Sequence, residues 1–297
     1  MSGGQGGHDA SLYQTDAGRK IIVIAHVLII AGSDCSGGAG IQADLKTVMA
    51  LGGYGMSAIT ALTAQNTKGV RAVHTPPADF LRQQIEACLE DIGADAIKIG
   101  MIGSIENAEV IAEVLRANPD IPVVLDPVMV ATSGAALGSD EVTQFIKQTL
   151  VPLASIITPN IPEAEALLGR GIKSVDAALT AAKDLRDLGA GAVLLKGGHG
   201  KGKIVTDILW DGQDSHIFEN PRIETRSTHG TGCTLASAIA AGTAQGMGLQ
   251  KTCERAISYV HQAIRTAPGL GEGHGPLNHG LEKFQPKAIS GRVKKMQ

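Results

Sequence analysis

Residues 27–40 read VLIIAGSDCSGGAG, and this stretch decides the fold. Its first five residues are all apolar, which is typical of a strand buried in a parallel sheet. Glycines and small polar residues follow, and helical spacing begins at residue 42. A strand that leads through a glycine-rich loop into a helix is the repeating unit of layered α/β folds.

The rest of the chain repeats this order of strand and helix. Further strand-length apolar runs are expected at 96–99, 123–125, 156–158 and 193–195. Helical spacing predicts helices over 78–91, 105–117, 141–149, 177–188, 231–245 and 251–266. Two short β runs over 203–219 are joined by Asp211 and Gly212, a pair suited to a tight hairpin. We therefore expect an α/β fold with this hairpin at one edge of the sheet.

The chain shows no internal repeat and no proline-rich linker that would divide it. We expect a disordered extension over 1–25, one domain over 26–284 and a flexible basic tail over 285–297. In such sheets ligands bind beyond the carboxyl ends of the strands, where the glycine-rich loops fall. The loops at 134–138 and 197–202 are candidate lids.

The composition excludes several classes of partner. The formal net charge is −3, and the aromatic residues are only four Phe, three Tyr and one Trp. Neither nucleic acid nor an anionic membrane is expected as a partner, which favours a small ligand. The four cysteines have no zinc-binding spacing, and residues 21–31 are too short to span a membrane. The prediction is a cytoplasmic protein.

The strongest local signal is STHGTGC at 227–233, which precedes an apolar helix. Glycines at a helix start let an anion approach main-chain N–H groups and the positive end of the helix dipole. Such a site suits the charge that develops on a transferring phosphoryl group. A helix whose glycines only permit tight packing explains the segment equally well.

Two common nucleotide motifs are absent. The loop at 32–40 lacks the G-x-G-x-x-G spacing of a dinucleotide site, and no acidic residue follows at the distance that a ribose contact needs. No G-x-x-x-x-G-K-[ST] loop occurs either. If the protein uses ATP, it must bind it with another architecture.

Asp44 and Gln65 are candidates to face a common pocket, from the first turns of a helix and the end of an apolar run. The amide of Gln65 offers one acceptor and two donors, so it can pair with the amino group and ring nitrogen of an aminopyrimidine. An exposed helix Asp and a loop Gln are the plain structural alternatives.

Three charged residues follow predicted strands or start a helix. Glu163 stands at the capping-box position after Asn160, which accounts for both residues structurally. Together with Asp126, Glu163 also suits magnesium, which favours one or two carboxylates plus substrate phosphates. Lys196 ends a strand, where it either reaches a phosphate or is merely solvated.

Seven segments resemble, in this order, the motifs of hydroxymethylpyrimidine and phosphomethylpyrimidine kinases, which belong to the ribokinase-like superfamily. They are AGSDCSGGAGIQADLK (31–46), TAQNT (63–67), KIGM (98–101), DPVM (126–129), TPNIPEA (158–164), LKGGH (195–199) and THGTGCT (228–234). The resemblance extends from about residue 27 to about residue 276. It implies a three-layer ribokinase-like fold with a mostly parallel central sheet, helices on both faces and a small β edge.

The resemblance also implies an activity and its site. The activity is ATP-dependent phosphorylation of 4-amino-5-hydroxymethyl-2-methylpyrimidine, and of its monophosphate, in thiamine biosynthesis. ATP and magnesium are the implied cofactors, a monovalent cation is an open addition, and the assembly is a homodimer. The matching positions are Gly32, Asp44, Gln65, Met101 and Val128 for the pyrimidine, Gly230, Gly232 and Cys233 for the anion hole, Asp126 and Glu163 for magnesium, and Lys196, Asn160 and Thr228 for the nucleotide.

Cys233 departs from the many superfamily members that carry Asp at this position. An aspartate accepts a hydroxyl proton at neutral pH, whereas a thiol must first ionise. The helix start favours a lowered thiol pKa, although a bound phosphate would oppose that shift. Our hypothesis is that Cys233 is the base for the first phosphorylation.

Three other functions are compatible with parts of the sequence. A pyridoxal or pyridoxine kinase is the nearest, because relatives with a Cys in this loop act on that ring. A vitamin-binding or regulatory protein without catalysis is disfavoured by the joint presence of Asp126, Glu163, Lys196 and Cys233. A nicotinamide-dependent dehydrogenase is disfavoured by the missing fingerprint.

Overall fold

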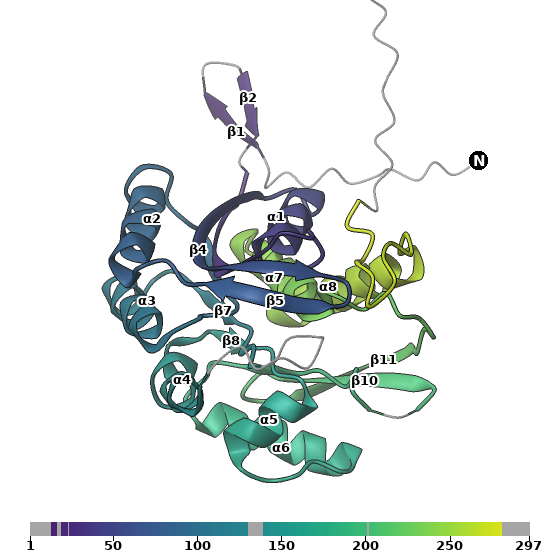
Figure 1. The fold of residues 1–297 in the computed structure, drawn as a ribbon. Coiled ribbons are helices and arrows are strands. Elements are labelled where there is room, and N and C mark those ends of the chain that lie inside the picture. The colour runs from purple at the N-terminus through teal and green to yellow at the C-terminus, as the bar shows by residue number, and fades with distance from the viewer. Residues whose placement is uncertain (1–12, 17–18, 23, 130–138, 201, 281–297) are drawn as a thin grey trace, which may run out of the picture.

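A nine-stranded sheet forms the centre of the protein in a computed structural model that describes residues 13–16, 19–22, 24–129, 139–200 and 202–280 (Figure 1). The strand order is β11-β10-β9-β8-β7-β6-β3-β4-β5. Pairing is parallel from β4 through β3, β6, β7 and β8 to β9, and antiparallel at both edges. The strands are β3 (His26–Asp34), β4 (Tyr54–Asn66), β5 (Gly69–His74), β6 (Ala96–Ile99), β7 (Val123–Leu125), β8 (Ile156–Ile157), β9 (Val193–Leu195), β10 (Ile204–Trp210) and β11 (Ser215–Pro221).

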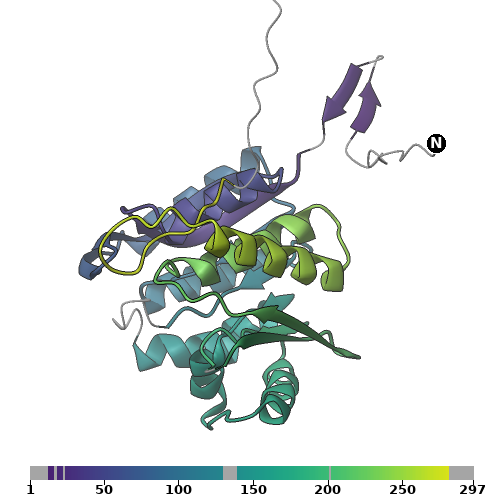
Figure 2. The same cartoon turned by 90° about the vertical axis from the view of Figure 1, so that its right-hand side faces the viewer.

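Helices cover both faces of this sheet, as the two views in Figures 1 and 2 show. They are α1 (Gly40–Ala50), α2 (Ala78–Asp91), α3 (Ile105–Ala117), α4 (Asp140–Phe145), α5 (Ile161–Leu168), α6 (Val175–Asp187), α7 (Thr231–Ala244) and α8 (Leu249–Arg265). Successive strand residues point to opposite faces. Leu28 and Ile30 therefore pack with α2 and α3, whereas Val27 and Ile29 pack with α7 and α8. The predicted three-layer α/β fold with helices on both faces is confirmed.

Most of the predicted elements appear with their expected boundaries, and the hairpin β10–β11 lies at the sheet edge as predicted. The opposite edge was not predicted: β4 and β5 form an antiparallel pair there. The helix expected over 141–149 is also different. α4 ends at Phe145, and the chain then forms a π-helical turn, Ile146–Leu150, followed by a 3₁₀ turn, Val151–Leu153. The proline at position 152 has no N–H group to extend an α-helix.

Strands β1 (Tyr13–Asp16) and β2 (Arg19–Ile22) form a two-stranded antiparallel hairpin that projects from the rest of the protein in both views. Residues 1–12, 17–18 and 23 of the expected extension, the tail at 285–297 and the candidate lid at 134–138 lie outside the described residues. Among the helices that the structure describes, none combines the length and the apolar character needed to cross a membrane.

Candidate active site

One cavity of about 820 Å³ lies at the carboxyl ends of the parallel strands, where ligands bind in folds of this kind. It brings together residues from segments spread along the chain from Ala31 to His274. Twelve of the thirteen site residues predicted from the sequence line it: Gly32, Gln65, Met101, Asp126, Val128, Asn160, Glu163, Lys196, Thr228, Gly230, Gly232 and Cys233.

Asp44 is the exception. This residue belongs to α1, its side chain is fully buried, and it is not among the residues that line the cavity. One carboxylate oxygen lies 2.8 Å from the Lys98 Nζ atom, and the other accepts a hydrogen bond of 2.7 Å from the Ser237 hydroxyl. The structure therefore does not bring Asp44 to the cavity with the other predicted residues: both of its oxygens are engaged inside the protein, and its partner Lys98 lines the cavity instead.

Lys98 is a charged residue within the short buried strand β6. Burial alone would lower the pKa of its ammonium group, but the Asp44 carboxylate outweighs this effect, with smaller contributions from Cys233 and Asp126, and the pKa is raised. The Lys98–Asp44 pair is therefore a charged pair that connects β6 to α1 and, through Ser237, to α7.

The start of α7 has the backbone geometry of the anion site that the glycine pattern predicts. Gly230 caps the helix in the left-handed region, with φ of 85°, and a Cβ atom there would lie 1.9 Å from the Gly38 carbonyl oxygen. Only glycine fits both constraints. Gly232 and Cys233 belong to the first turn, whose N–H groups lack intrahelical acceptors and can donate to an anion.

The anion site lies next to a pair of opposite charges. A Cβ atom on Gly232 would stand 3.3 Å from both the Asp126 Oδ2 atom and the Lys196 Nζ atom. Lys196 donates to Asp126 Oδ1 at 2.7 Å, and its Nζ atom lies 3.9 Å from Glu163 Oε2. The missing side chain at position 232 therefore leaves space for phosphate oxygens between the helix start and Lys196.

Glu163 has two roles in this arrangement. It completes a capping box with Asn160, in which each side chain accepts a hydrogen bond from the other residue's backbone N–H. Burial raises the pKa of Glu163 to about 7, Lys196 opposes the shift, and Asp126 adds to it. Glu163 is thus close to half-protonated at neutral pH and would ionise more readily beside a cation.

Asp126 and Glu163 are the carboxylates available to a divalent ion at this end of the cavity. No group of three His, Cys, Asp or Glu side chains that could hold a metal by themselves occurs in the described part of the chain. Two carboxylates match the chemistry of magnesium, which completes its shell with water and substrate phosphates. The donor set fits magnesium bound together with a nucleotide.

The thiol of Cys233 differs from the prediction. Its position at a helix start favours a lowered pKa, but the structure gives the opposite direction. Burial raises the pKa of the thiol to about 11, while Lys98 opposes this shift and the carboxylates of Asp44 and Asp126 add to it. Cys233 is therefore a neutral thiol at pH 7, because desolvation outweighs the helix dipole here.

Another part of the cavity combines apolar side chains with a single amide. Met101 and Val128 line it, and a Cβ atom on Gly32 would stand 3.1 Å from the Met101 sulfur atom. Gln65 closes this part from strand β4 with a polar amide. Apolar walls with one convergent amide are typical of a small-molecule site.

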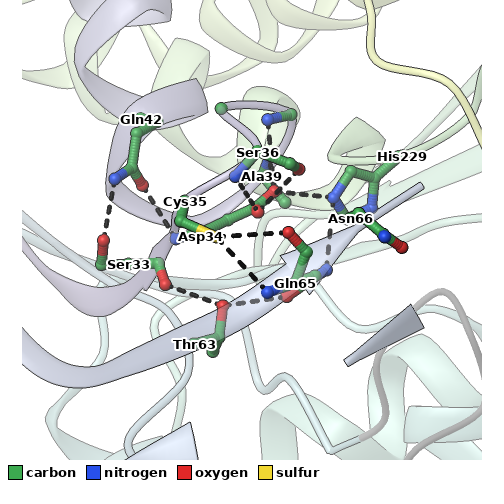
Figure 3. A network of polar contacts seen from close by, with 12 residues as sticks. Ser33, Asp34, Cys35, Ser36, Ala39, Gln42, Thr63, Gln65, Asn66 and His229 are labelled. Carbon is green, nitrogen blue, oxygen red and sulfur yellow. Dashed lines mark hydrogen bonds and ion pairs between the residues drawn. The ribbon is translucent and has the colours of Figure 1, made fainter. Parts of the chain in front are cut away.

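A polar network around Gln65 was not predicted from the sequence (Figure 3). His229 lies 2.8 Å from Asp34, and both residues are buried and line the cavity. Burial alone would raise the pKa of Asp34, but hydrogen bonds from His229 and Ser36 lower it to about 2. The adjacency of His229 to the glycine-rich helix start was the one available sequence signal.

The cavity also has an aliphatic lining from β10, the loop after β11, α7 and α8. Its aliphatic lining consists of Val205, Ile223, Leu235, Ile257, Val260 and Ile264. Arg222 holds the loop after β9 beside it, because its guanidinium donates to the carbonyl groups of Gly198 and Gly202 at 2.8 and 2.7 Å. Asn160 and Thr228 line the same continuous cavity.

Known proteins resemble this chain both in sequence and in fold. Residues 34–278 match the phosphomethylpyrimidine kinase family. The hydroxymethylpyrimidine/phosphomethylpyrimidine kinase of Bacillus subtilis is 47% identical over 260 residues, which cover 86% of this chain and 95% of that protein. A thiamine biosynthesis bifunctional protein of Geobacter sulfurreducens is 51% identical over 85% of this chain, which spans only 52% of that longer protein.

Two solved structures show the same fold at substantial sequence identity. A phosphomethylpyrimidine kinase from Clostridium difficile has a TM-score of 0.73 at 44% identity, covering 81% of this chain and 99% of that chain. An ADP complex of Bacillus subtilis pyridoxal kinase has a TM-score of 0.81 at 36% identity, covering 87% and 98%. The sequence relatives and the structural neighbours thus lead to the same group of small-molecule kinases.

Proposed function

The chain belongs to the phosphomethylpyrimidine kinase family, and we propose that its cavity performs two successive ATP-dependent phosphorylations. The first converts 4-amino-5-hydroxymethyl-2-methylpyrimidine to its monophosphate, and the second converts the monophosphate to the diphosphate, in thiamine biosynthesis. One observation carries this proposal: the glycine helix start beside Lys196 and Asp126 shares a single cavity with the ring-sized part closed by Gln65. A phosphate site and a ring site therefore lie within reach of one substrate.

The group transfer follows from this layout. The ring would lie between Gln65 and the apolar side chains of Met101 and Val128, with its hydroxymethyl group toward the start of α7. The hydroxyl oxygen forms a bond to the terminal phosphorus of ATP, the bond from that phosphorus to the bridging oxygen breaks, and ADP leaves. The Cys233 sulfur, as thiolate, takes the hydroxyl proton.

Charge neutralisation supplies the rest of the catalysis. Lys196 would contact the transferring phosphoryl group, and the N–H groups of Gly232 and Cys233 would receive the charge that develops on its oxygens. Asp126 and Glu163 would hold magnesium, which neutralises phosphate charge when it is bound with the nucleotide. The aliphatic part beside Asn160, Thr228 and Arg222 would take the nucleotide base.

Phosphorylation of pyridoxal is the second candidate function. It is favoured by the structural comparison, because the pyridoxal kinase of Bacillus subtilis has the higher of the two reported TM-scores. The sequence identity is higher for the pyrimidine kinases. We therefore rank the pyrimidine substrate first.

Four further features stay predictions. A homodimer and a stimulating monovalent cation rest on the family, whereas a cytoplasmic location and one kinase domain over 26–284 rest on the composition and organisation of the chain. The four cysteines, all free in the structure, agree with a reducing compartment. Light scattering of the purified chain would test the dimer.

The proposed function is tested by comparing kcat/KM for hydroxymethylpyrimidine, its monophosphate and pyridoxal at saturating Mg·ATP. We expect both pyrimidines to be phosphorylated, each with a kcat/KM at least tenfold above that of pyridoxal. A preference for pyridoxal would assign the protein to vitamin B6 salvage, and no turnover of any of the three would support a binding protein.

A further inference from the structure

Two polar side chains contact the Gln65 amide: Thr63 from the same strand, and His229 from the start of α7 (Figure 3). Gln65 Nε2 lies 3.3 Å from His229 Nε2, and Gln65 Oε1 lies 3.2 Å from Thr63 Oγ1. His229 Nε2 is also 2.8 Å from Asp34 Oδ2. These contacts decide how the amide is turned, and therefore what it offers to a ligand.

The first constraint comes from Asp34. Its carboxylate accepts hydrogen bonds from the Ser36 N–H and hydroxyl groups, at 2.9 and 2.7 Å, and from the N–H groups of Gly38 and Ala39, at 3.2 and 2.9 Å. A carboxylate surrounded by donors acts only as an acceptor. The Nε2 atom of His229 must therefore carry the hydrogen, which it donates to Asp34. Toward Gln65 this atom has no lone pair, so it can share its hydrogen with an acceptor but cannot accept a hydrogen bond.

The second constraint comes from Thr63. Its hydroxyl group has a single hydrogen, which it donates to the Ser33 carbonyl oxygen at 2.9 Å. Toward Gln65 the Thr63 oxygen can then only accept a hydrogen bond. Thr63 and His229 thus present opposite hydrogen-bonding roles to the two ends of the same amide.

We propose that His229 and Thr63 are positioning residues that fix the Gln65 amide with Oε1 toward His229 and Nε2 toward Thr63, and thereby set which ring edge the site accepts. The nitrogen and oxygen of an amide have the same shape, so hydrogen bonding decides their placement. The opposite placement, to which the distances of 3.3 and 3.2 Å above refer, sets Nε2 against the His229 N–H and leaves Oε1 against a hydroxyl without a hydrogen to give. Exchanging the two amide atoms pairs both contacts. Both constraints select the same orientation independently.

The fixed amide has a consequence for substrate choice, and this inference rests on the proposed function. One N–H of Gln65 and one lone pair of Oε1 remain for the ligand, in a set order. An aminopyrimidine edge offers a ring nitrogen acceptor beside an amino donor. The 4-oxo analogue offers the reverse, a ring N–H beside a carbonyl oxygen, and a locked amide cannot turn over to meet it.

The surroundings of His229 prevent it from moving aside. Its side chain is buried, and its backbone N–H donates to the Gly275 carbonyl at 3.1 Å. A Cβ atom on Gly38 would lie 2.5 Å from the His229 ring, so the loop that follows β3 packs directly on it. The ring therefore holds its N–H in one place between Asp34 and Gln65.

The test compares matched pairs of variants. His229→Gln keeps an N–H near the position of Nε2, whereas His229→Leu removes it; Thr63→Ser keeps the hydroxyl, whereas Thr63→Val removes it. For each variant, kcat and KM are measured with hydroxymethylpyrimidine and with its 4-oxo analogue, together with the KM for ATP. Thermal unfolding of each variant monitors stability.

We expect the wild-type protein to have a higher kcat/KM for the amino substrate than for the 4-oxo analogue. In His229→Leu and in Thr63→Val the ratio of these two kcat/KM values should fall about tenfold, which is the effect of one lost or mispaired hydrogen bond. The change should lie in the KM for the pyrimidine, with the KM for ATP unchanged, and His229→Gln and Thr63→Ser should restore the preference. An unchanged preference in both deletion variants, or an equal loss in the conservative variants, would overturn the inference. Failure of wild-type turnover would instead overturn the proposed function.

Discussion

The Nζ atom of Lys98 lies 2.8 Å from the carboxylate of Asp44, and neither side chain is exposed. This pair joins β6 to α1, and the Ser237 hydroxyl extends the contact to α7, the helix whose first turn forms the anion site. Both residues of the pair act on the pKa of the Cys233 thiol: Lys98 lowers it and Asp44 raises it. The start of α7 is thus connected to β6 and α1 by a buried ionic contact, of which Lys98 lines the cavity.

The first prediction concerns this pair. Lys98→Met leaves the Asp44 carboxylate buried without its partner, and we expect it to lower the free energy of unfolding by roughly 3–5 kcal/mol. Asp44→Leu combined with Lys98→Met should cost clearly less than the sum of the two single changes. Denaturant unfolding measures all three, and Arg170→Met, in an exposed pair with Asp184, is the control with an expected cost below about 1 kcal/mol. Additive effects of the two buried substitutions would contradict the coupling.

The second prediction concerns the role of Cys233 as base. Cys233→Ala should reduce kcat for hydroxymethylpyrimidine by about 100-fold or more, the usual contribution of a positioned base. The monophosphate carries an ionised phosphate as nucleophile and needs no base, so its phosphorylation should change only a few-fold. Initial rates with both substrates decide the matter. If the variant phosphorylates the alcohol within a few-fold of the wild-type rate, Cys233 is not the base.

The third prediction follows from the raised pKa of the same thiol. With a pKa of about 11, the thiolate fraction increases about tenfold per pH unit below that value. If the thiolate is the base, kcat for the alcohol rises with this slope between pH 7 and 9. The monophosphate, measured in parallel, should lack the rise, and equal pH profiles for the two substrates would exclude a thiolate base.

The fourth prediction concerns Glu163, whose pKa is raised by burial from 4.5 to about 7. The folded state then binds more protons than the unfolded state between these values, so this residue lowers stability as the pH rises from 4.5 to 7. Glu163→Gln keeps a capping-box residue and removes the titration. Relative to wild type, the variant should gain up to about 3 kcal/mol in unfolding free energy between pH 4.5 and pH 8.

The same Glu163 substitution has a functional readout. A proton on Glu163 competes with magnesium, so the magnesium concentration for half-maximal activity should rise as the pH falls from 8 to 6 in the wild-type protein. The Glu163→Gln variant should need more magnesium at every pH and lose most of this pH dependence. A magnesium requirement that is identical in both proteins would show that Glu163 is only a helix cap.

The fifth prediction concerns the space beside Gly232. In Gly232→Ala the added methyl group would stand 3.3 Å from the Asp126 and Lys196 side chains, where we place phosphate oxygens. We expect kcat to fall about tenfold or more, with a small change in unfolding free energy. Gly248→Ala is the matched control, because a Cβ atom there meets nothing within 4 Å. Equal activity of the two variants would place the phosphate elsewhere.

The sequence predicted the central part of the fold because the signals were local. Apolar runs such as that of β7 and the helices α2 and α3 were placed with their observed boundaries. β4 was missed as a strand because it lies near the sheet edge, between a parallel and an antiparallel neighbour. Buried and exposed residues both occur along it, so its sequence is not one continuous apolar run. Only its apolar centre at 58–64 stood out in the sequence.

The candidate site was predicted less completely, since its electrostatics depend on burial. The glycine pattern located a helix start that lines the cavity, but the pKa of Cys233 moved in the opposite direction to the helix-start argument. Asp34 and His229 meet across 195 positions in the chain, and no spacing rule connects such residues. Lys98 offered a signal that was not used: a lysine between two isoleucines in a buried strand requires a buried partner.

The central claim is best tested by recording product masses over time for the purified protein with Mg·ATP and hydroxymethylpyrimidine as sole acceptor. Two successive phosphoryl transfers in one cavity predict that the monophosphate appears first and is then converted to the diphosphate, with one ADP formed at each step. A monophosphate that accumulates without further conversion would contradict the second transfer, and the absence of any phosphorylated pyrimidine would contradict the kinase itself.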